Sequence, residues 1–158
     1  MRSDLRALLF DFDGLLLDTE SAEYQAWCEL YERHGHVLEL STWSLAVGTI
    51  GGFDPSAHLT GLGTPPTTEA LAEQKRRVLE LCELEDFLPG VDALLDVARG
   101  RGLRTCIVSS SSHAWIEDHL RRRSGLERFD AIVCADGDSG RAKPRPTLYL
   151  EALERLGV

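Results

Sequence analysis

Two aspartates, Asp11 and Asp13, stand one residue apart directly after a short apolar run, and Gly14 follows them. If the extended geometry of the run continued, both carboxylates would project from the same side of the chain. Gly14 would allow a turn that residues with a side chain resist. Two carboxylates at the carboxyl end of a buried strand, where open α/β sheets bind ligands, predict chemistry on a phosphate with a hard cation.

The chemistry of such a pair divides between its two members. One aspartate can attack phosphorus and form an acyl phosphate, and the other can transfer a proton. A bound Mg²⁺ would orient the phosphate and offset the repulsion between carboxylates and phosphate oxygens. Asp11 and Asp13 are therefore candidates both for catalysis and for metal binding. The alternative is that the two acids only decorate a turn.

Two later segments offer groups that could bind a phosphate. Ser109, with Ser110 beside it, lies where an apolar run ends and a helix begins, and hydroxyl and backbone N–H groups at a helix N-terminus favour phosphate. Lys143 precedes Pro144 in a loop stiffened by prolines, from which its ammonium could reach phosphoryl oxygens. The alternatives are a serine that only caps the helix and a lysine at a solvated surface.

Short apolar runs bounded by polar residues or glycine predict three strands, at Ala7–Phe10, Leu103–Val108 and Ala131–Ala135. Apolar side chains at helical spacing predict helices over Ser21–Tyr31, Ala70–Leu84, Val91–Ala98, His113–Arg123 and Pro146–Leu156, and residues 41–63 predict short helices joined by turns. The alternation of strands and helices in the second half predicts parallel βαβ units. We therefore predict an α/β fold with a Rossmann-like parallel sheet.

The helical stretch after the first strand interrupts this alternation. We predict that residues 15–86 form an inserted α-helical cap over the catalytic end of the sheet. Residues 1–14 and 87–158 would then form one discontinuous Rossmann-like core.

The composition limits the partners of the chain. A net charge of −9 over 158 residues argues against a general nucleic-acid surface. No apolar run approaches the ~20 residues that span a bilayer, and the N-terminal residues show no signal-peptide pattern. The four cysteines form no CxxC pair, which favours free thiols in a reducing cytoplasm over a zinc site. We predict a cytoplasmic protein that binds neither nucleic acid nor membrane.

The strings DFDGLLLDTE, VSSSS and AKPRP, in this order and at these separations, resemble motifs one to three of the haloacid dehalogenase superfamily. The likeness covers essentially the whole chain and points to the branch of phosphatases and β-phosphoglucomutases with a small helical cap. It implies that Asp11 is the nucleophile and Asp13 the general acid and base. It also implies that Ser109 binds phosphate and that Lys143 steadies nucleophile and phosphate. The implied Mg²⁺ ligands are the carboxylate of Asp11 and the backbone carbonyl of Asp13.

The family pattern continues into a fourth strand that ends in an acidic pair, which supplies the remaining Mg²⁺ ligand. That third acidic ligand is absent from this sequence, so we expect a core with three strands and without the later ones, incomplete at its C-terminus. Asp136 and Asp138 precede Lys143 and are not expected to replace the ligand. The first strand would be an apolar edge through which the chain could self-associate.

The predicted function is Mg²⁺-dependent hydrolysis of a small phosphorylated metabolite, a sugar phosphate or nucleoside monophosphate, through an aspartyl phosphate on Asp11. Asp13 would act as general acid and base. One alternative is a non-catalytic remnant that still binds phosphate. The other is a phosphosugar mutase. The mutases of this branch carry a histidine on the first cap helix. Glu23 stands at that position here, which favours the phosphatase.

Overall fold

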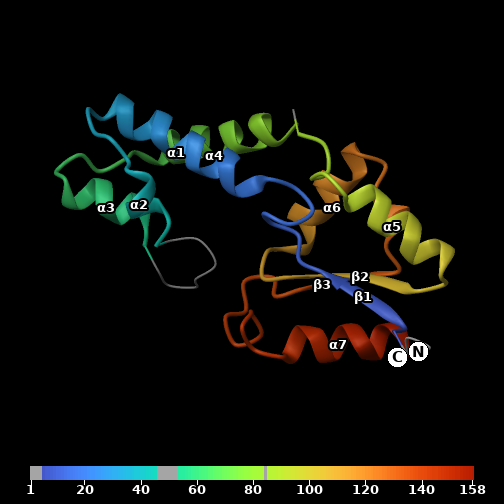
Figure 1. Cartoon of the computed structure of the whole chain (residues 1–158). Coiled ribbons are helices and arrows are strands. Elements are labelled where there is room, and N and C mark those ends of the chain that lie inside the picture. Colours follow the sequence, from blue (N-terminus) through green and yellow to red (C-terminus); the bar gives the residue numbers. More distant parts are fainter. Residues whose placement is uncertain (1–4, 46–52, 84) are drawn as a thin grey trace. The chain divides into compact units, whose positions relative to one another are not determined.

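The computed structural model describes residues 5–45, 53–83 and 85–158 (Figure 1). Residues 1–4, residues 46–52 of the predicted short-helix segment, and Leu84, the predicted end of a helix, lie outside the described residues. The chain divides into two compact units. The first consists of Met1–Asp18 with Asp86–Val158, and the second of Thr19–Glu85.

The first unit contains a parallel sheet of three strands, β1 (Ala7–Phe10), β2 (Arg104–Ser109) and β3 (Ala131–Cys134). The strand order is β1-β2-β3, and the register pairs Phe10 with Ile107 and Ser109 with Cys134. The carboxyl ends of all three strands therefore meet at the same edge of the sheet. The predicted α/β fold with a parallel sheet is confirmed. Within the described residues, β1 pairs only with β2.

Three helices of the same unit cover the sheet. Helix α7 (Thr147–Leu156) lies on one face, and α5 (Val91–Gly100) and α6 (His113–Arg122) lie on the other (Figure 1). A short 3₁₀ turn, Leu126–Arg128, joins α6 to β3. Because both faces are covered, the residues of β2 after Arg104 are all buried, and Cys106, Ile107 and Val108 form its apolar centre.

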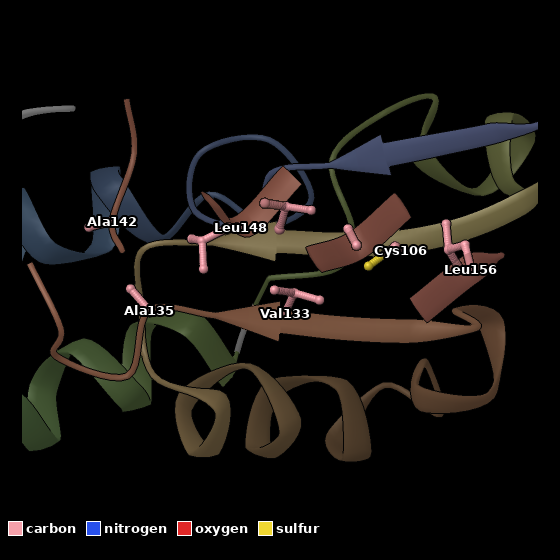
Figure 2. Packing of buried hydrophobic residues seen from close by; sticks show 8 residues of the cluster. Cys106, Val133, Ala135, Ala142, Leu148 and Leu156 are labelled. Carbon is pink, nitrogen blue, oxygen red and sulfur yellow. The ribbon is translucent and has the colours of Figure 1, made fainter. Parts of the chain in front are cut away.

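The packing between α7 and the sheet forms a hydrophobic cluster of the first unit (Figure 2). Leu148, Ala152 and Leu156 recur every four residues on α7, so they form one buried stripe. They pack with Cys106 of β2 and Val133 of β3. This cluster fixes α7, and with it the end of the loop that carries Lys143.

The described residues of the second unit form four helices, α1 (Thr19–Arg33), α2 (Leu40–Trp43), α3 (Pro55–Gly61) and α4 (Thr68–Glu83). The unit has its own buried cluster, which includes Trp27, Tyr31 and Trp43. Helices α1 and α4 pack together, and Arg77 of α4 forms an ion pair with Glu29 of α1 at 2.9 Å. No helix in the described ranges is both long and apolar enough to span a bilayer.

Candidate active site

Asp11 and Asp13 lie directly beyond β1, where the backbone leaves the sheet and turns. Gly14 adopts φ 71°, the left-handed conformation for which glycine was predicted here, and its N–H donates to the carbonyl of Leu17 at 2.8 Å. Phe12, between the two aspartates, has no exposed surface, whereas both aspartates are partly exposed. The buried phenyl ring thus anchors a loop whose two carboxylates remain accessible.

The carboxylate of Asp11 is held on one side only. Its Oδ1 accepts the N–H of Phe12 at 2.8 Å and lies 2.5 Å from Nζ of Lys143, which comes from the loop between β3 and α7. The Lys143 and Asp11 side chains are 21% and 42% exposed, respectively. Among the residues the structure describes, none forms a hydrogen bond with Oδ2 of Asp11. The structure therefore brings Lys143 to Asp11, and the second carboxylate oxygen has no hydrogen-bond partner among the described residues.

Ser109, the last residue of β2, and Ser111, two positions later, contact the other carboxylate. The hydroxyl of Ser111 donates to Oδ2 of Asp13 at 2.5 Å, and that of Ser109 reaches the same oxygen at 3.4 Å. Ser109 is 1% exposed and its hydroxyl also accepts the N–H of Ser111 at 3.0 Å. The predicted site residue Ser109 thus lies beside Asp13, as does Ser111, which was not predicted.

The remaining two serines have different partners. The hydroxyl oxygen of Ser110 accepts the backbone N–H of Lys143 at 3.2 Å, which ties the loop after β2 to the loop after β3. Ser112 caps α6, because its hydroxyl accepts the N–H of Trp115 at 3.3 Å. The capping role that was an alternative for the serine run therefore falls on Ser112, and Ser109 and Ser110 point elsewhere.

Trp115, in the first turn of α6, was also missed at the sequence level. Its indole Nε1–H donates to Oδ1 of Asp13 at 3.0 Å. Its ring packs edge-on against His119, with ring centroids 4.2 Å apart, and His119 lies 6.0 Å from the ring of Phe12. The sequence did contain a signal for it. Trp115 comes three positions after a serine that follows a strand and can cap a helix, and side chains in the first turn of such a helix lie near the carboxyl edge of the sheet.

His119 is a buried polar side chain that contributes no hydrogen bond. It is 1% exposed, and neither ring nitrogen has a partner among the described residues. Burial, and next the positive charge of Arg123, lower the pKa of His119. Both causes favour the neutral imidazole, which packs against the ring of Trp115.

The acidic residues after β3 have structural partners. Asp136 accepts the N–H of His113 at 2.6 Å, at the start of α6, and Asp138 accepts the N–H of Gly140 at 2.8 Å. No group of three or more His, Cys, Asp or Glu side chains in the described ranges is arranged to hold a metal ion. Asp11 and Asp13 supply oxygen donors that fit Mg²⁺, which commonly uses one or two carboxylates together with waters and substrate phosphate oxygens.

The site therefore combines four features at the carboxyl edge of a parallel sheet. It has a partly exposed carboxylate on Asp11, a cation on Lys143, a second carboxylate on Asp13, and hydroxyl groups from the end of β2 and the turn that follows it. This set can attack an electrophile, balance negative charge and transfer a proton.

Comparisons with known proteins agree with this geometry. The model of the family described as haloacid dehalogenase-like hydrolase matches residues 5–158. YhcW of Bacillus subtilis is 42% identical over 156 residues, which cover 98% of this chain and 70% of the relative. Fructose-1-phosphate phosphatase YqaB of Escherichia coli is 30% identical over 162 residues, which cover 96% of this chain and 80% of the relative.

A solved structure supports the same assignment. The crystal structure of a HAD family hydrolase from Deinococcus radiodurans, with bound phosphate and sodium, has a TM-score of 0.77 and 26% identity. The match covers 98% of this chain and 68% of that one. From the family match, the relatives and the fold together, the chain belongs to the haloacid dehalogenase-like hydrolases.

Proposed function

We propose that this chain is a Mg²⁺-dependent phosphatase that hydrolyses a small phosphomonoester of the sugar-phosphate class. The observation that carries the proposal is the state of Asp11. One of its oxygens is held by Lys143 and the N–H of Phe12, the other has no hydrogen-bond partner among the described residues, and the side chain is 42% exposed. The name of YqaB, a fructose-1-phosphate phosphatase, supports the sugar-phosphate class.

In the first step, Oδ2 of Asp11 attacks the phosphorus atom of the ester. A bond forms between this oxygen and phosphorus, and the bond between phosphorus and the ester oxygen breaks. The departing oxygen keeps the electron pair and takes a proton from the carboxyl group of Asp13. Lys143 offsets the negative charge on the phosphoryl oxygens, and the hydroxyl of Ser109 turns from Asp13 to donate to one of them.

In the second step, water attacks the phosphorus atom of the aspartyl phosphate. The carboxylate of Asp13, which lost its proton in the first step, takes one from the water. The bond between Asp11 and phosphorus breaks, inorganic phosphate leaves, and both aspartates return to their starting states. Ser110 links the loops that carry Ser109 and Lys143, and its own O–H can donate to a phosphate oxygen.

Asp11, through its carboxylate, and Asp13, through its backbone carbonyl, would hold Mg²⁺. The ion, when bound, neutralises charge on the phosphate and orients it. In the same proposal, residues 1–14 and 87–158 form the catalytic core, and residues 15–86 form a cap that selects the substrate. The division of the chain after Asp18 and before Asp86 supports these boundaries.

The test is phosphate release from fructose 1-phosphate in the presence of Mg²⁺ by the chain and by Asp11→Asn. We expect the substitution to abolish turnover, because an amide cannot act as the nucleophile. Acid quenching during turnover, followed by mass spectrometry of peptides, should place a phosphoryl group on Asp11 in the unsubstituted chain.

The matched control is Asp138→Asn, in the loop after β3, where an amide oxygen can still accept the N–H of Gly140. This control should retain activity. Turnover by Asp11→Asn at the rate of the unsubstituted chain would overturn the proposal.

A further inference from the structure

We propose that Trp115 is a positioning residue for Asp13, whose indole N–H fixes one carboxyl oxygen so that the other one carries the transferred proton. This inference rests on the proposed phosphatase function, since it concerns the proton that Asp13 gives to the leaving group. It assigns a role to a side chain that the family resemblance and the sequence motifs left without one.

The two oxygens of Asp13 have chemically different partners. Oδ1 accepts the indole N–H of Trp115 at 3.0 Å, whereas Oδ2 lies 2.5 Å from the hydroxyl of Ser111. An indole N–H can only donate, but a hydroxyl can either donate or accept. A proton on Oδ2 is therefore accommodated by rotation of the Ser111 hydroxyl. A proton on Oδ1 would compete with the fixed N–H of Trp115.

The two oxygens of Asp13 also differ in which one lies beside the proposed phosphate-binding hydroxyl. Ser109, whose hydroxyl is proposed to bind phosphate, reaches Oδ2 at 3.4 Å. The oxygen that can carry the proton is thus the one beside the phosphate-binding hydroxyl. Trp115 holds the opposite oxygen. Because proton transfer requires the acid to lie within hydrogen-bonding reach of the leaving oxygen, rotation of this carboxyl would slow the reaction.

The ring of Trp115 is held in place by packing against His119. Its ring packs against His119 with a centroid distance of 4.2 Å and an interplanar angle of 77°, and His119 is 1% exposed. His119 in turn packs against Phe12, the buried residue between Asp11 and Asp13. The residues Phe12, His119 and Trp115 therefore form one supported stack that connects α6 to the loop after β1.

The first arm of the test compares Trp115→Phe on two esters. Phenylalanine keeps a ring to pack against His119 but removes the N–H. Fructose 1-phosphate has a leaving group that needs a proton, whereas p-nitrophenyl phosphate does not. Release of the leaving group in a single turnover follows only the first step, because hydrolysis of the aspartyl phosphate comes later and is common to both esters. In such measurements we expect the rate for fructose 1-phosphate to fall about tenfold to hundredfold, and the rate for p-nitrophenyl phosphate to stay within about threefold.

Asp13→Ala should show the same selective loss in larger degree. Tyr149→Phe, a conservative substitution at an exposed position on α7, should show none. If leaving-group release from both esters slows to the same extent in Trp115→Phe, the role of Trp115 is merely structural and the inference is overturned. Unchanged turnover of both esters would also overturn it.

The second arm does not need turnover. With ¹⁵N-labelled indoles the chain gives signals from its three tryptophans, and the one that Trp115→Phe removes belongs to Trp115. Asp13→Ala should shift this signal and speed its hydrogen exchange, while the other two indole signals stay in place. If the unsubstituted chain hydrolyses neither ester, the proposed function fails, and this arm alone decides whether Trp115 holds Asp13. If Asp13→Ala leaves the Trp115 signal and its exchange rate unchanged, the inference is overturned.

Discussion

Replacing Lys143 by Met separates the contribution of its charge to phosphate binding from its contribution to folding. Nζ of Lys143 lies 2.5 Å from Oδ1 of Asp11, in a pair whose carboxylate side chain is 42% exposed. Solvent screens such a pair, and exposed ion pairs contribute only about 0–1 kcal/mol to the free energy of unfolding. We therefore expect Lys143→Met to change the midpoint of thermal unfolding very little.

The effect on phosphate affinity should be larger. Without the ammonium, an anion entering the site meets the carboxylates of Asp11 and Asp13 with no neighbouring cation from Lys143. A unit charge about 4 Å from another contributes about 1 kcal/mol in water and about 4 kcal/mol at an effective dielectric constant near 20. The partly exposed site lies between these limits, so the Kd for phosphate should rise between about fivefold and several-hundred-fold.

Titration calorimetry with inorganic phosphate and Mg²⁺ measures this Kd directly. Lys75→Met is the matched control, because Lys75 is the other lysine of the chain and lies exposed on α4. It should bind phosphate as the unsubstituted chain does. If Lys143→Met binds phosphate with an unchanged Kd, Lys143 does not contact the phosphate and the assignment of the site is wrong.

Three further measurements test the packing around the site. Burial lowers the pKa of His119, so below its ordinary value of 6.5 the unfolded chain takes up a proton that the folded chain does not. The free energy of unfolding should fall as the pH drops through this window, and urea titrations should show a weaker pH dependence for His119→Leu; an equal dependence would contradict this account. Among the four cysteines, all in the described part of the chain, Cys28 is partly exposed, and burial raises the pKa of Cys106 to about 11 and of Cys134 to about 12. A thiol-reactive dye should therefore label Cys28 first in the folded protein, and early labelling of Cys134, mapped by peptide mass, would argue against this core. Leu148→Ala, at a position with no exposed surface, should lower the free energy of unfolding by about 2–5 kcal/mol in denaturant titrations, whereas a loss below about 1 kcal/mol would mean that α7 packs loosely.

The strands show what the sequence could and could not predict. β1 spans Ala7–Phe10, as its apolar run predicts. The run and the strand end together because the next residue, Asp11, carries a carboxylate that stays partly exposed. β2 was predicted to end at Val108 but extends to Ser109, a polar residue that is 1% exposed. Burial of this serine is acceptable because its hydroxyl has partners in Asp13 and the N–H of Ser111. Such partners are tertiary, so an apolar pattern does not contain them.

The same limit explains the part of the site that was missed. The residues Ser109 to Ser112 are chemically identical, yet they contact Asp13, Lys143, Asp13 again, and the first turn of α6, respectively. Their roles follow from the path of the backbone after β2, which the sequence does not specify residue by residue. The contact of Trp115 was missed for a related reason, since its partner Asp13 lies 102 residues away along the chain.

The pairing of β1 with β2 has a consequence for the order of events during synthesis. Ala7 pairs with Arg104, so the partner of the first strand emerges from the ribosome only after about 100 further residues. At a synthesis rate of about 5–20 residues per second, the apolar segment of β1 stays unpaired for about 5–20 s before the sheet can begin to form. The second unit, Thr19–Glu85, is complete in sequence before β2 is made, and its own buried cluster can form first. Replacing this unit by a short linker should therefore speed refolding of the sheet, because the loop that must close becomes much shorter.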